Sequence, residues 1–128
     1  MTYLLDTHTF LWLLREPANL PRKVQAIARD TAAKLALSIA TPWEMAIKVS
    51  LGKLDAADIV DQFERLAAIG GYTVLETTPA QVIRSGLLPR YYGDPFDRLL
   101  VAQALDLHIP IVSRDHEFDR YGVRRIWA

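Results

Sequence analysis

Residues 2–12 read TYLLDTHTFLW, and this opening stretch sets the expectation for the whole chain. Tyr3, Leu4 and Leu5 form an uninterrupted apolar run, which is typical of a parallel strand covered by helices on both faces. The run stops at Asp6, so this carboxylate is expected where a buried strand meets solvent. In open α/β sheets ligands bind beyond the carboxyl ends of the strands, which makes Asp6 the first candidate site residue. The alternative is that Asp6 only caps the helix that follows it.

The composition limits the class of protein. The chain has 128 residues, of which 51% are hydrophobic and 23% charged, so a single domain over residues 1–128 is expected. The formal net charge is zero, and any contact with nucleic acid must therefore use local patches. No cysteine is present, which excludes disulfides, thiolate catalysis and cysteine-based zinc sites. Neither a signal peptide nor a membrane span is predicted, and a cytoplasmic location is expected.

Apolar runs alternate with helix signals along the chain. The predicted strands are residues 3–5, 35–39, 72–75, 109–113 and 123–127. The predicted helices are residues 10–14, 22–32, 42–51, 56–69, 79–87 and 95–107. Thr41 is the expected N-cap of the third helix, with Glu44 as its capping-box acid. Because helical segments separate the strands, the sequence predicts right-handed crossovers and a mostly parallel sheet between two helix layers.

Four carboxylates stand at the boundaries of the predicted elements. Asp6 and Asp115 follow strands, whereas Glu44 and Asp97 lie at the helix starts TPWE and DPFD. The carboxyl ends of parallel strands share one edge, and if the two helix starts turn toward it, four acids meet there. Their repulsion would favour protons or hard cations such as Mg²⁺ or Mn²⁺. The alternative for each acid is a capping role, and Asp94 is the plainest N-cap among them.

Five blocks of sequence carry a resemblance to a known family. They are residues 5–12 (LDTHTFLW), 43–54 (WEMAIKVSLGKL), 94–104 (DPFDRLLVAQA), 113–115 (SRD) and 121–123 (YGV). In this order they resemble PIN-domain ribonucleases and, more narrowly, the VapC-like toxins of type II toxin–antitoxin pairs. The resemblance implies a three-layer α/β sandwich whose five-stranded sheet has the order 3-2-1-4-5. It also implies that the four acids converge, which local pattern leaves open.

The resemblance assigns roles to particular residues. Asp6, Asp97 and Asp115 match the family's metal-binding acids, and Glu44 completes the catalytic quartet by holding a water or acting as a base. The implied cofactor is Mg²⁺ or Mn²⁺, and the implied reaction is hydrolysis of RNA phosphodiester bonds. The supporting residues are Thr7, Asp94 and Ser113.

The resemblance also implies partners. A cognate small DNA-binding antitoxin is expected to neutralise the enzyme, and the toxin is expected to form a homodimer. The RNA substrate should be held by cations at the rim of the acidic centre, although the same cations are also candidates for surface ion pairs. These candidates are Lys48, Lys53, Arg90, Arg98 and Arg114.

Other classes of protein explain part of the pattern. A haloacid-dehalogenase-like phosphatase also places an acid after its first strand, but it needs a second Asp where this chain has His8. A phosphoacceptor receiver domain needs paired acids after the first strand and a lysine after a late strand. A non-catalytic α/β interaction domain, in which the acids only cap helices, is the remaining alternative.

Overall fold

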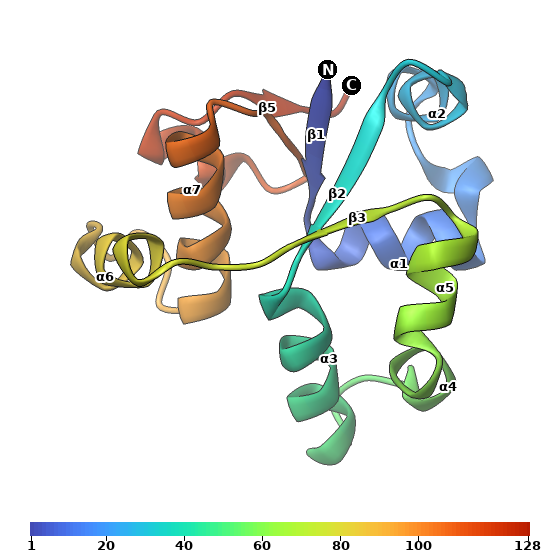
Figure 1. Cartoon of the computed structure of the whole chain (residues 1–128), viewed down its shortest axis with the longest axis horizontal. Helices are drawn as coiled ribbons and strands as arrows, with labels where there is room; N and C mark the ends of the chain where they lie inside the picture. Colours follow the sequence, from blue (N-terminus) through green and yellow to red (C-terminus); the bar gives the residue numbers. More distant parts are fainter.

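A five-stranded parallel sheet forms the centre of the computed structural model, which describes all residues 1–128. Its strands are β1 (Thr2–Leu5), β2 (Lys34–Ser38), β3 (Thr73–Leu75), β4 (Ile111–Val112) and β5 (Arg125–Ile126). Every pairing is parallel, and the order is β3-β2-β1-β4-β5 (Figure 1). The predicted order and the central place of the first strand are therefore confirmed.

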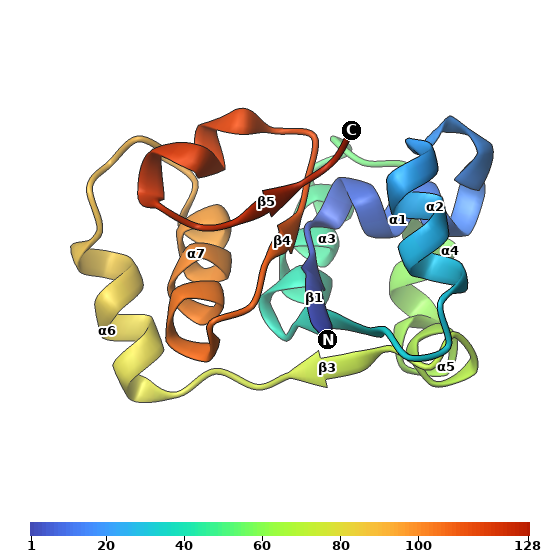
Figure 2. The ribbon, with the colours of Figure 1, turned by 90° about the horizontal axis from the view of Figure 1, so that it is seen from above.

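Helices cover both faces of this sheet. They are α1 (Thr7–Arg15), α2 (Arg22–Arg29), α3 (Ala40–Ser50), α4 (Ala57–Asp61), α5 (Phe63–Ile69), α6 (Pro79–Leu87) and α7 (Pro95–Leu107), with the 3-10 helices η1 (Pro17–Asn19) and η2 (His116–Tyr121). Helices α1, α2, α4 and α5 gather on one side of the molecule, whereas α6 and α7 lie on the other (Figure 2). The predicted three-layer sandwich is confirmed. No helix combines the length and the apolar character that a membrane span needs.

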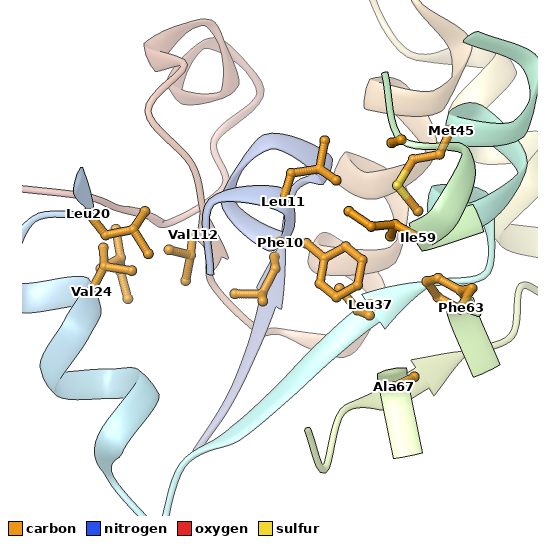
Figure 3. Packing of buried hydrophobic residues seen from close by; sticks show 13 residues of the cluster. Phe10, Leu11, Leu20, Val24, Leu37, Met45, Ile59, Phe63, Ala67 and Val112 are labelled. Carbon is orange, nitrogen blue, oxygen red and sulfur yellow. The ribbon is translucent and has the colours of Figure 1, made fainter. Parts of the chain in front are cut away.

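Alternating side chains of the central strand divide the core in two. Leu5 packs with Phe10 and Phe63 in a cluster that includes residues of α1, α2, α4 and α5 (Figure 3). Leu4 belongs to a second cluster with Leu100 of α7. A strand buried on both faces reads as a continuous apolar run, which explains the opening stretch of the sequence. Shifting this strand by one residue would move Leu4 and Leu5 each to the opposite face of the sheet, so burial fixes its register. In this register Asp6 lies at the carboxyl end of the strand.

Two local predictions were wrong. The segment 56–69 is two short helices, since α4 ends at Asp61 and α5 begins at Phe63. Thr41 is not an N-cap, because α3 already begins at Ala40 and no side chain caps its first turn. The Ser38 hydroxyl instead accepts a hydrogen bond from the Ala40 amide at 3.0 Å, which starts the helix directly after β2.

Two other helix starts are capped by side chains. Thr78 caps α6 in a complete capping box with Gln81. Asp94 caps α7, because its Oδ1 accepts a hydrogen bond from the Phe96 amide at 2.8 Å, and Pro95 occupies the first helical position. The Asp94 cap fixes the start of α7, and Asp97 lies in the first turn of this helix.

Candidate active site

Asp6 lies directly after β1 and is buried, with 8% of its surface exposed. Its Oδ1 accepts a hydrogen bond from the Thr9 amide at 2.9 Å, so the predicted capping role is real. Its Oδ2 accepts a hydrogen bond from the Ser113 hydroxyl at 2.5 Å, across from the neighbouring strand β4. The Ser113 hydroxyl in turn accepts from the Asp115 amide at 3.0 Å. Ser113 therefore joins the two acids that follow β1 and β4.

Glu44 projects from the start of α3 and is also buried. Its Oε1 accepts a hydrogen bond from the Thr7 hydroxyl at 2.6 Å, and its Oε2 pairs with the Lys48 ammonium at 2.6 Å. A capping-box role is therefore wrong for Glu44, because its carboxylate turns toward α1. Lys48, predicted as an RNA contact, is engaged with this carboxylate. Burial alone lowers the pKa of Lys48, but the hydrogen bond and the nearby acids raise it overall.

Asp97 lies in the first turn of α7, and its carboxylate makes no hydrogen bond within the protein. Burial, together with the charges of Asp94, Glu44 and Asp6, raises the pKa of Asp97 to about 8. Lys48 lowers the pKa by a smaller amount. The fold thus brings Asp97 close enough to the other acids for their charges to repel one another.

Asp115 is exposed and caps η2, since its Oδ1 accepts a hydrogen bond from the Glu117 amide at 3.0 Å. Beside it lies Tyr92, whose buried hydroxyl has no hydrogen-bond partner. Burial raises the pKa of Tyr92, and the charges of Asp115, Asp97 and Asp6 raise it further. The sequence pattern indicated only a loop at Tyr92, so this neighbour of three acids was missed.

The predicted cations at the rim separate into two kinds. Lys53, Arg90 and Arg114 are exposed, as an RNA contact requires. Arg98 is buried, with 6% of its surface exposed, and its Nη1 donates to the Tyr92 carbonyl at 3.2 Å. Arg98 is therefore too buried to serve as the predicted surface contact to phosphate. Its guanidinium holds the loop that precedes α7.

The carboxylates fit a hard divalent cation in donor type and in charge, because they supply several oxygens and repel one another without a counter-ion. No group of three acid or histidine side chains converges closely enough to form a complete ligand set. Two of the acids are instead held by hydrogen bonds from Thr9, Ser113, Thr7 and Lys48. The geometry thus provides a concentrated negative charge and leaves the carboxylate of Asp97 without a partner.

Comparison with known proteins gives the same architecture. One chain of the VapBC-1 structure from nontypeable Haemophilus influenzae aligns with a TM-score of 0.68 at 18% identity, covering 98% of this chain and 97% of that one. The VapBC2 structure from Rickettsia felis, bound to a promoter DNA fragment, gives 0.66 at 12% identity and 100% coverage of both chains. FitAcB from Neisseria gonorrhoeae gives 0.65 at 16% identity, covering 97% and 96%. No curated protein sequence matches the chain.

At these identities the structural matches establish the fold. A family model adds evidence from sequence, because the PIN domain model matches residues 3–124, which is nearly the whole chain. The sheet order and the acids at its carboxyl edge agree with that match. The phosphatase alternative is set aside, since the required second acid is absent at the exposed His8. The chain belongs to the PIN-domain family.

Proposed function

We propose that this chain is a metal-dependent endoribonuclease toxin of a type II toxin–antitoxin pair, acting in the cytoplasm as a single PIN-like domain over residues 1–128. Its substrate is RNA, and its cofactor is Mg²⁺ or Mn²⁺. The observation that carries the proposal is Asp97, a half-buried carboxylate without a hydrogen bond, whose pKa is raised to about 8 by burial and by the neighbouring acids. A carboxylate that has no hydrogen-bond donor in the protein and lies near other acids is suited to binding a cation.

The roles of the residues follow from their contacts. Asp6, Asp97 and Asp115 would hold the cation, and Ser113 orients Asp6 through its hydroxyl. When bound, the cation polarises the phosphodiester and stabilises the charge that develops on its oxygens. Glu44 is held in place by hydrogen bonds from Thr7 and Lys48, which suits a residue that orients water or accepts its proton.

The test is cleavage of end-labelled RNA by the purified protein in Mn²⁺ and in EDTA. Cleavage is expected only with the metal. Asp6→Asn and Asp97→Asn should lose more than about 100-fold in rate, exceeding the loss expected for an outer-shell partner, because the amide keeps the shape but not the charge. Glu64→Gln is the matched control, since it neutralises an exposed acid outside the site. Wild-type cleavage in EDTA, or by either Asn variant, would contradict the proposal.

The proposed antitoxin is supported by the similar structures, several of which are toxin–antitoxin or DNA complexes by their descriptions. We propose that a small DNA-binding protein binds this chain and blocks its acidic centre. Co-expression with the product of an adjacent small reading frame should yield a complex that no longer cleaves RNA. A complex that retains full activity would contradict this role.

The proposed homodimer has a candidate surface. Trp43 and Ile47 are exposed on one side of α3, and Leu51 is exposed directly after it. Ile83 and Leu87 are exposed on α6. Both helices pack against α7, so the two exposed sets flank one structural element. Covering such side chains with a second copy would remove apolar surface from water.

Sedimentation across a concentration series tests the dimer. Leu87→Glu places a charge on the most exposed of these apolar side chains and should produce monomers at concentrations where the wild type is dimeric. Leu107→Glu is the matched control, because Leu107 is an exposed leucine at the end of α7. A wild type that is monomeric at every concentration would contradict the homodimer.

A further inference from the structure

A ladder of aromatic rings leads outward from the acidic centre. The Tyr92 ring, whose hydroxyl lies near Asp115, packs 5.0 Å from the buried Phe118. The Tyr121 ring is nearly parallel to that of Tyr92, at 9° and 6.0 Å between centroids. The Tyr91 ring follows at 5.0 Å from that of Tyr121. The ladder therefore connects the edge of the proposed catalytic site with the protein surface.

The outer end of the ladder is open to solvent. Tyr91 is 42% exposed, and the Arg120 guanidinium carbon lies 4.1 Å from the centroid of its ring. The Arg120 side chain is itself 55% exposed and also contacts Glu117 at 3.2 Å. An exposed ion pair of this kind contributes little to stability. The guanidinium therefore covers one face of the Tyr91 ring, and the two flat groups form a stacked pair that is exposed at the surface.

The inner rings already account for the structural role of the ladder. The Tyr121 hydroxyl donates to the Pro89 carbonyl at 2.6 Å and accepts from the Tyr92 amide at 2.9 Å. These bonds tie the loop between α6 and α7 to η2, and the two segments run near each other in Figure 2. Neither the Tyr91 hydroxyl nor the Arg120 guanidinium takes part in these hydrogen bonds, so the exposed surfaces of both side chains are not needed to hold the loop.

We infer that Tyr91 and Arg120 form a stacking site for one unpaired nucleobase of a single-stranded RNA substrate. Aromatic rings and guanidinium planes both stack on bases, and the positive charge attracts the phosphate backbone. In a duplex the faces of internal bases are already stacked, so the site favours single strands. The inference rests on the proposed ribonuclease function and adds that these two residues hold one base of the substrate.

Binding tests the site without requiring cleavage. The probe is a fluorescein-labelled single-stranded oligoribonucleotide in EDTA, and its Kd is measured by anisotropy. Tyr91→Leu should raise Kd by about 5- to 100-fold, the range expected for losing one base–aromatic stack. Tyr91→Phe keeps the ring and should bind like the wild type. Equal Kd values for the Leu and Phe variants would overturn the inference.

Arg120 is tested by salt dependence. Arg120→Gln should weaken binding and reduce the slope of log Kd against log salt by about 0.7, as for the loss of one phosphate contact to a single strand. Arg29→Gln is the matched control, because Arg29 is an exposed arginine on α2, on the opposite side of the molecule (Figure 1). An unchanged slope in Arg120→Gln, or the same change in both variants, would contradict the assignment.

A cleavage assay separates this inference from the proposed function. The cleaved oligoribonucleotide is remade with abasic nucleotides in turn on either side of the cut. One abasic position should slow the wild type and have little further effect on Tyr91→Leu. If the wild type cleaves every abasic substrate like the parent, the stacking site is wrong while the ribonuclease stands. A wild type that neither binds nor cleaves RNA overturns both. This arm also decides the matter if Tyr91→Leu does not fold.

Discussion

The two halves of the acidic centre differ in how their charges are held. In the satisfied half, Asp6 and Glu44 are buried and accept four hydrogen bonds, from Thr9, Ser113, Thr7 and Lys48. In the open half, Asp97 has no hydrogen bond and Asp115 is exposed. The satisfied half is therefore positioned by folding itself. The open half keeps an electrostatic cost that a bound cation would relieve.

The largest expected effect is on the stability of the metal-free protein. The pKa of Asp97 is about 8 in the folded chain and 3.8 ordinarily, so the folded state holds a proton that the unfolded state has released. The free energy of unfolding should therefore fall as pH rises from about 4 to about 8. Asp97→Asn removes this penalty and should be more stable than the wild type in EDTA, by at most on the order of 5 kcal/mol above pH 8.

Urea titrations at several pH values measure this difference, which should vanish near pH 4. In millimolar Mn²⁺ the advantage of Asp97→Asn should shrink or reverse, because the wild type gains about 2.7 kcal/mol when the metal is at 100 times its Kd. If Asp97→Asn were less stable than the wild type in EDTA at every pH, the Asp97 carboxylate would stabilise the fold, as those of Asp6 and Glu44 do. The comparison between the halves would then fail.

An intermediate effect is expected for Thr7→Val. The substitution keeps the shape of the side chain but leaves Oε1 of the buried Glu44 without its donor, which should cost about 1–3 kcal/mol of stability. Cleavage should fall by about 10- to 100-fold, the range for outer-shell partners of a metal site. Thr31→Val is the control at an exposed threonine. Loss of stability with wild-type cleavage would show that Glu44 is structural.

The sequence predicted the parts of this molecule that depend on neighbouring residues. The apolar run ending at Asp6 gave the first strand, and the Asp94-Pro95 pair gave the start of α7. The sheet order came from the family resemblance, because strand pairing is a long-range property that local pattern leaves open. The break at Gln62 escaped prediction because the apolar spacing of Ile59 and Phe63 continues through it.

The hydrogen bonds around the candidate acids could not be predicted from the sequence. Glu44 fits a capping box in sequence, yet its carboxylate turns toward Thr7, which lies 37 residues away in the chain. The unpartnered hydroxyl of Tyr92 depends on the packing of η2 against the loop before α7, and neither segment predicts it alone. Arg98 follows Asp97 in sequence but points into the protein, because the helix turns successive side chains to different faces.

The smallest effect on stability is expected for Asp115→Asn. Asp115 is exposed, so its charge is screened by water and its neutralisation relieves little repulsion. Asparagine can still accept the hydrogen bond from the Glu117 amide, and the free energy of unfolding should change by less than about 0.5 kcal/mol in EDTA.

Asp115→Ala is the control, because it loses the cap and should lower the free energy of unfolding by about 1 kcal/mol, a difference that the measurement must resolve. Cleavage should nevertheless fall in both variants, because each loses a charged oxygen that would hold the cation in the proposed site. If Asp115→Asn instead stabilises the metal-free protein as much as Asp97→Asn does, the exposed acid carries the same repulsion as the half-buried one, and burial is not what separates the members of the open half.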